Sequence, residues 1–202
     1  MSLDPTSPHL ALAHEGPIDA TFLEEFRTSV SARGLDLRVE QRISTCAMAS
    51  LELVLGTAVV VWVFKAYFTG FLEESGRLHA QALKGAIKTL GKRLRDLRYV
   101  RITARGPIDP RDRFSPIYSV WTERDADSRF KMLVNSDFTE AGLEVALDAY
   151  LTFIETYHTG CLEPEDMDIL AAALPVGGVV LLAYDESTAS IKLVDPLFER
   201  LG

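Results

Sequence analysis

The stretch LVLGTAVVVWVF at residues 53–64 is an almost uninterrupted apolar run, and the rest of the chain is organised around it. A membrane-spanning helix needs about 20 largely uncharged residues. The uncharged run has only twelve residues, bounded by Glu52 and Lys65. Its length therefore predicts a helix buried in a protein core, which we place at residues 46–74.

Two features of this run support other interpretations. The β-branched residues 59–61 favour a strand, although propensity is a weak prior that burial overrides. The aromatic residues Trp62, Tyr67 and Phe68 lie beside a basic segment, as in helices that lie in or insert into membranes. The alternative hypothesis is therefore a membrane-acting effector that inserts residues 51–72.

A second helix is predicted after a break at residues 75–76. An apolar seam at helical spacing covers one side of it. The seam consists of Leu83, Ile87, Leu90, Leu94 and Leu97. The two predicted helices would then pair as an antiparallel hairpin, with the second helix shielding part of the first.

Charge is distributed unevenly along the chain, whose net charge is −8. Residues 77–113 carry eleven Lys or Arg against three Asp or Glu, a balance of +8, whereas residues 137–202 carry two against thirteen, a balance of −11. A basic stripe runs along the second helix, away from its apolar seam. We predict that this stripe binds an acidic protein or another anion through Lys84, Lys88, Lys92, Arg95 and Arg98. A solvated helix face and internal pairing with the acidic C-terminal third are the alternatives.

Helices and strands flank the hairpin on both sides. A helix is predicted from about residue 19 to Gly34, and others begin at Asp137, with Glu140 as its capping partner, and at Pro164. Alternation at residues 35–43 predicts a strand. Further strands are predicted at residues 99–105, 117–123, 129–134, 179–184 and 190–194.

The predicted fold class is α+β. We expect a largely antiparallel sheet of about six short strands, packed against the buried helical hairpin and two C-terminal helices. Residues 1–17 are rich in proline and are predicted to form a loosely ordered leader. Residues 18–202 are then expected to form a single domain.

Residues with reactive side chains are few and scattered. Glu52, His79 and the His158–Cys161 pair are the candidates for a small enzyme of unknown class, but none of them has the third group that a triad needs. Cys46 could form a disulfide bond with Cys161. No metal-ligand spacing or phosphate-binding loop is present, so no cofactor or metal is predicted.

These observations favour a non-enzymatic protein-interaction module: an adaptor, an inhibitor or immunity-type partner, or a regulatory subunit. Nucleic acid is disfavoured as a partner because the chain is acidic and no aromatic residue interleaves the basic stripe. The N-terminus lacks a basic region followed by an apolar one and is therefore not a secretory signal, so we expect a cytoplasmic protein. A bacterial source is part of this hypothesis.

Overall fold

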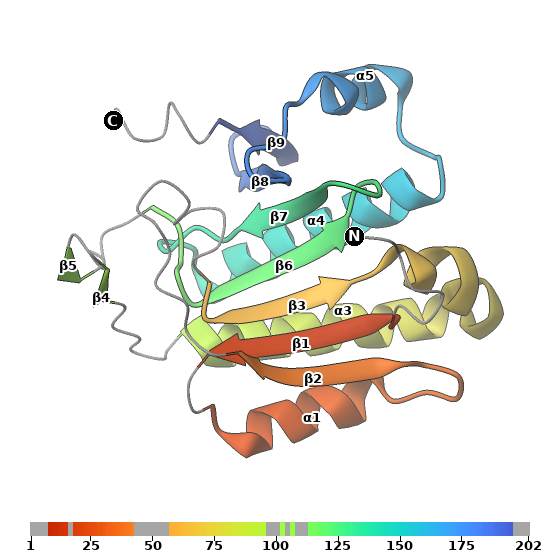
Figure 1. The fold of residues 1–202 in the computed structure, drawn as a ribbon, viewed down its shortest axis with the longest axis vertical. Coiled ribbons are helices and arrows are strands. Elements are labelled where there is room, and N and C mark those ends of the chain that lie inside the picture. The colour runs from red at the N-terminus through yellow and green to blue at the C-terminus, as the bar shows by residue number, and fades with distance from the viewer. Residues whose placement is uncertain are drawn as a thin grey trace.

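The computed structural model describes residues 8–15, 18–42, 57–95, 102–103, 106–107 and 113–195. In these residues a seven-stranded mixed sheet has the order β2-β1-β3-β6-β7-β8-β9 (Figure 1). Its strands are β1 (Leu10–Glu15), β2 (Leu37–Arg42), β3 (Val59–Val63), β6 (Tyr118–Glu123), β7 (Arg129–Leu133), β8 (Val179–Asp185) and β9 (Ser190–Val194). The helices are α1 (Ala20–Val30), the π-helix η1 (Tyr67–Phe71), α3 (Leu72–Arg95), α4 (Glu140–His158) and α5 (Pro164–Ala172). The short strands β4 (Ile102–Thr103) and β5 (Gly106–Pro107) pair with each other.

The α+β class is confirmed, but the sheet is mixed rather than largely antiparallel, and it has seven strands rather than six. Three pairs are parallel, namely β1 with β2, β3 with β6, and β7 with β8. Parallel neighbours need a long crossover, and these three crossovers contain α1, α3, and α4 with α5. The hairpins β6–β7 and β8–β9 are antiparallel, as predicted.

The apolar run that was predicted to be helical forms strand β3 at Val59–Val63. This strand lies between β1 and β6, with Val61 and Val63 buried on one face and Val60 on the other. A strand that is covered on both faces has a continuous run of apolar residues in the sequence. The hydrophobic periodicity of such a run does not distinguish a strand from a buried helix. The β-branched residues therefore indicated the correct structure. Of the rest of the predicted helix, residues 46–56 lie outside the described part of the chain, whereas residues 67–74 are helical, in η1 and the start of α3.

The predicted leader also contributes to the sheet. Strand β1 lies between β2 and β3, and the side chains of Leu10 and Leu12 are fully buried. Alternating Leu and Ala residues were hidden among prolines, so this strand was missed. Residues 1–7 and 16–17 lie outside the described residues.

The break predicted at residues 75–76 is absent, because α3 continues from Leu72 to Arg95. The chain enters this helix through η1, and the Lys65 N–H donates to Glu123 Oε2 at 2.7 Å. The π-helix places Tyr67, Phe68 and Phe71 in the core together. Helices α1 and α4 both pack against α3, and residues 59–63 of the predicted N-terminal partner form strand β3 instead.

Helices α1, α3 and α4 pack on the same face of the sheet, where α3 and α4 lie behind the strands in Figure 1. Given the strand order and directions, the crossover through α4 must then have the opposite hand from the crossovers through α1 and α3. Nearly all such crossovers are right-handed. The β7–β8 connection, which contains α5, is therefore the unusual part of the fold.

Candidate functional site

The basic stripe of α3 faces α4. The contacts join Lys84 to Thr152 and Glu155, Lys88 to Asp148, and Lys92 to Glu140 and Glu144. The N···O distances are 3.1 Å for Lys88–Asp148 and 2.8 Å for Lys92–Glu140. Because the numbers rise along α3 as they fall along α4, the two helices are antiparallel. These three lysines are therefore paired within the protein with acidic residues of its C-terminal third, which was one of the alternatives to partner binding.

The electrostatics of the pairs agree with this geometry. Hydrogen bonds to Glu140 and Glu144 raise the pKa of Lys92, and the bond from Lys92 lowers the pKa of Glu140, with a smaller contribution from Arg95. The side chains of Lys84, Lys88 and Lys92 are only 22–31% exposed. Arg98 lies outside the described residues. Binding of an external anion by this stripe stays a prediction, and the charges of its three lysines are already paired with α4.

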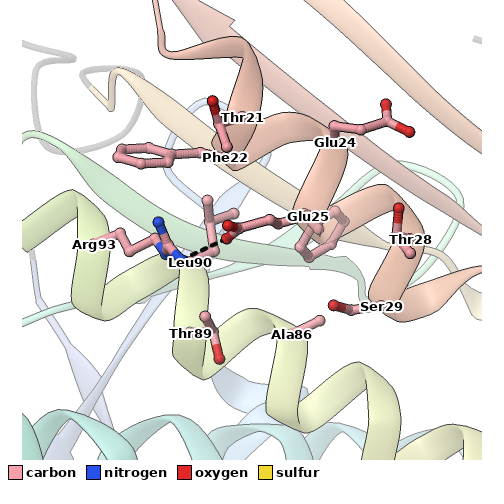
Figure 2. A pocket seen from close by; sticks show the side chains of 11 residues that line it. Thr21, Phe22, Glu24, Glu25, Thr28, Ser29, Ala86, Thr89, Leu90 and Arg93 are labelled. Atoms are coloured by element: carbon pink, nitrogen blue, oxygen red, sulfur yellow. Dashed lines mark ion pairs between the residues drawn. The ribbon is translucent and has the colours of Figure 1, made fainter.

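A groove of about 380 Å³ separates α1 from α3 (Figure 2). Its floor is formed by Phe26 and Leu90. At one end, Arg93 Nη2 pairs with Glu25 Oε2 at 2.7 Å, and the guanidinium lies 5.1 Å from the centre of the Phe22 ring. This pair ties the two helices together. The groove has a volume at the lower limit for ligand pockets.

His79 is a structural residue rather than a free base. Its Nε2 lies 2.9 Å from the Val30 carbonyl, which can only accept, so Nε2 carries the proton. Its Nδ1 therefore accepts from the Tyr67 hydroxyl at 2.9 Å. Both ring nitrogens are engaged in a buried bridge between α1 and α3.

His158 and Cys161 do not form a catalytic pair in the described contacts. The His158 ring stacks on Phe68, and its Nε2 lies 3.3 Å from the Thr122 hydroxyl. Cys161 is an exposed free thiol whose Sγ lies near a backbone carbonyl. The possible bridge from Cys161 to Cys46 is not described, because Cys46, like Glu52, lies outside the described residues.

Neither a metal site nor a membrane span is found among the described residues. No group of three or more His, Cys, Asp or Glu side chains there could hold a metal ion. None of the helices in this part of the chain is both long enough and apolar enough to cross a membrane. Of the aromatic residues assigned to a membrane, Tyr67 and Phe68 are buried in the core.

The sheet face opposite the helices carries a cluster of tryptophans and cations that was not anticipated. The rings of Trp62 and Trp121 lie 4.9 Å apart. The Arg129 guanidinium lies 5.4 Å from Trp62, and the Lys131 ammonium lies 5.4 Å from Trp121. Lys131 is only 2% exposed. Because Trp121 and Lys131 are buried, we assign these contacts to stability of the sheet.

Helix α5 and the loop after it expose more large apolar side chains than any other segment of the described part of the chain. Eight large apolar side chains are exposed in the described residues, and four of them fall within residues 167–176. We call these four the α5 surface: Met167, Ile169, Leu174 and Val176. Ile169 is 56% exposed and Leu174 is 89% exposed, whereas Leu170 is buried.

The C-terminal end of α5 is fixed by one side chain. The Arg124 guanidinium donates to the carbonyls of Leu170 and Ala173, each at 2.9 Å. These carbonyls belong to the last turn of the helix, where a cation is favourable. Asp125 lies 3.5 Å from Arg124 Nε and also caps the β6–β7 turn. Arg124 thus holds α5 against the end of this hairpin.

The fold does not need α5 to connect α4 with β8. The Tyr157 hydroxyl, near the end of α4, donates to the Arg124 carbonyl at 3.0 Å. The start of β8 lies at the same end of the sheet, because the Arg129 N–H donates to the Gly178 carbonyl at 3.0 Å. Helix-to-strand loops usually have about 2–6 residues, but residues 159–178 make twenty. Helix α5 is therefore an excursion from the compact fold.

The sequence contained two signals for this surface. Residues 132–191 include no Lys or Arg, and residues 163–170 (EPEDMDIL) mix acidic and apolar residues. The helix dipole explains why Glu165 and Asp166 stand at the N-terminus of α5, but it does not explain the exposure of the apolar residues. That exposure depends on tertiary packing.

Comparison with known proteins returned no matching family model, no matching curated protein and no matching solved structure. The function must therefore be inferred from the surface of this chain.

Proposed function

We propose that this protein acts by binding another protein, as an adaptor, an inhibitor or a regulatory subunit does, and that the α5 surface is where it binds. The observation that carries the proposal is the clustering of half of the exposed large apolar side chains on α5 and the loop after it. Clustered apolar side chains on a folded protein are typical of interaction sites. Loops on a rigid scaffold are also common places for function.

Burial of the α5 surface by a partner would contribute a substantial part of a binding free energy. Covering one Leu or Ile side chain contributes about 1.5–3 kcal/mol. Ile169 and Leu174 are the two most exposed members of the surface. Because Ile169 is 56% exposed and Leu174 is 89% exposed, covering the exposed part of both side chains would contribute about 2–4 kcal/mol. Anchors of this size dominate many protein interfaces.

The other surfaces support a function less well. An acidic partner of Lys84, Lys88 or Lys92 would have to compete with carboxylates already held beside them on α4. Insertion into a membrane through Tyr67 or Phe68 would require both residues to leave the core. Binding through the basic stripe would require existing ion pairs to be displaced, and binding to a membrane would require core residues to become exposed. Binding through the α5 surface requires neither change.

The proposal can be tested with a photo-crosslinking residue placed in the chain in its native cells. Position Leu174 is the probe, and position Leu78 on α3, which is 82% exposed, is the matched control. We expect a discrete crosslinked protein from position 174 and none from position 78. The captured protein is then purified and titrated against the wild-type protein to measure the Kd.

Two variants complete this test. Ile169→Ser with Leu174→Ser removes the proposed anchors, and Leu78→Ser removes an equally exposed leucine elsewhere. We expect the double variant to bind at least about tenfold more weakly, which corresponds to a loss of about 1.4 kcal/mol or more. The Leu78 variant should bind as wild type does. Equal binding by all three proteins, with unchanged thermal stability, would refute the assignment of the α5 surface.

A further inference from the structure

We infer that the partner of the α5 surface presents a positively charged segment that also carries apolar side chains. This inference rests on the proposed function and specifies the chemistry of the partner. Around the exposed apolar residues stand four exposed acidic residues: Glu163, Glu165, Asp166 and Asp168. Within the described part of the chain, none of the four takes part in an ion pair given for this structure, which separates them from the acidic residues of α4.

The helix itself accounts for only part of this charge. Acidic residues in the first turn of a helix stabilise it, and Glu165 and Asp166 occupy that turn. Asp168 lies beyond it, and the side chain of Glu163 at the N-cap makes no capping hydrogen bond. The dipole therefore leaves Asp168 unexplained, and no capping hydrogen bond requires the carboxylate of Glu163 at the N-cap.

Nearby cations do not neutralise the group. Residues 132–191 contain no Lys or Arg, so any compensating charge must come from elsewhere in the chain or from a partner. Among the described residues, Arg124 is a basic residue that contacts α5, and it binds the backbone carbonyls at the C-terminal end rather than these carboxylates. The fold thus fixes one end of α5 and leaves an acidic, partly apolar surface toward solvent.

This combination selects one kind of partner. Basic side chains would meet the carboxylates while apolar side chains of the same segment cover Ile169 and Leu174. A nucleic acid or an anionic membrane would be repelled by the four negative charges. An acidic protein would be repelled for the same reason, so the expected partner of this surface has the opposite charge from the expected partner of the α3 stripe.

The test uses a library of random twelve-residue peptides displayed on phage and selected on the full-length wild-type protein. Binders are depleted on the Ile169→Ser/Leu174→Ser variant, so that only peptides that need the α5 surface remain. We expect the remaining peptides to carry net positive charge and at least two large apolar residues. A synthetic copy of the most enriched peptide should lose about tenfold or more in affinity when NaCl rises from 50 to 500 mM.

A pair of charge variants then locates the effect. The first replaces Glu163, Glu165, Asp166 and Asp168 by the corresponding amides. The control replaces four other exposed acidic residues, Glu24, Glu40, Asp127 and Glu186, in the same way. Both change the net charge equally. We expect only the first to weaken binding of the peptide, by about tenfold or more.

The outcomes separate this inference from the proposed function. Peptides that depend on Ile169 and Leu174 but are neutral or acidic, or that bind equally well after the α5 amide substitutions, would overturn the basic partner and leave protein binding intact. Equal weakening by the control variant would show that net charge, and not α5, attracts the peptide, which also overturns the inference. If no peptide remains after depletion, that result contradicts both the basic partner and the proposed function of the α5 surface.

Discussion

Acidification should destabilise this protein through His158. The ring is packed between Phe68, whose centroid is 5.0 Å away, and Tyr157, at 5.1 Å. Burial, assisted by the positive charge of Lys65, lowers the pKa of His158 from 6.5 to about 4. The backbone of Glu123 has a smaller, opposing effect. The folded protein therefore resists protonation at a pH where the unfolded chain accepts a proton.

The direction and size of the effect follow from proton linkage. Because the folded pKa is below the unfolded one, stability is complete above about pH 6.5 and falls as the pH drops toward about 4, below which the loss is complete. Between pH 7 and pH 5 the full shift would correspond to roughly 2 kcal/mol. His158 is only partly buried, so we expect about 1 kcal/mol after allowance for solvent screening.

The assay compares wild type with His158→Gln, because glutamine can still donate to the Thr122 hydroxyl. Urea unfolding at pH 7 and pH 5 gives the free energy of unfolding of each protein. Carboxylates titrate in both proteins, so their contribution cancels in the difference. We expect wild type to lose about 1 kcal/mol more than the variant. Equal losses, or an NMR titration of His158 with a midpoint near 6.5, would refute the reasoning.

Three further substitutions test the packing of the fold by urea unfolding. Tyr150→Phe should stabilise the protein by about 1 kcal/mol, because the Tyr150 hydroxyl is fully buried and has no hydrogen-bond partner among the described residues. Unchanged or lower stability of the variant would contradict this prediction. Gly178→Ala should destabilise the protein by about 1–2 kcal/mol, because φ is +78° and an added Cβ would lie 3.2 Å from a backbone oxygen. Gly34→Ala should lower the free energy of unfolding by less, because Gly34 has a similar φ of +85° but open space around the added Cβ. Lys88→Glu should destabilise by up to about 1 kcal/mol, and adding Asp148→Lys should restore the loss unless the pair contributes nothing.

Local patterns predicted the elements that local interactions determine. The hairpins β6–β7 and β8–β9 were predicted because polar turns separate short alternating strands. The start of α5 at Pro164 was also predicted, since proline is favourable in the first turn of a helix. Helix α4 was placed correctly, but its N-cap is Thr139, whose hydroxyl accepts from the Gly142 N–H, and not the predicted Asp137.

The incorrect predictions concern features that depend on contacts between residues far apart in the sequence. Strand β3 pairs with β1 and β6, which lie about fifty residues on either side of it in the sequence, and a central strand carries no polar alternation to reveal it. Once the run was assigned to a helix, its parallel pairing with β6 and its antiparallel pairing with β1 could not be recognised. The orientation of the basic stripe was likewise beyond local reasoning, because Lys84 and Glu155 meet only through the packing of α3 on α4.

The segregation of charge along the chain has two different consequences in the fold. In the first, lysines of α3 at positions 84, 88 and 92 pair with acidic residues of α4 at positions 155, 148, and 140 with 144, so the two rows neutralise each other. In the second, the acidic residues of α5 stand on an excursion that the sheet does not require. A partner binding the α3 lysines must displace carboxylates that α4 already holds in place, whereas a basic partner of α5 displaces only solvent and counterions. Because the second exchange carries the smaller desolvation and rearrangement cost, α5 is the more favourable place for this protein to use its charge in recognition.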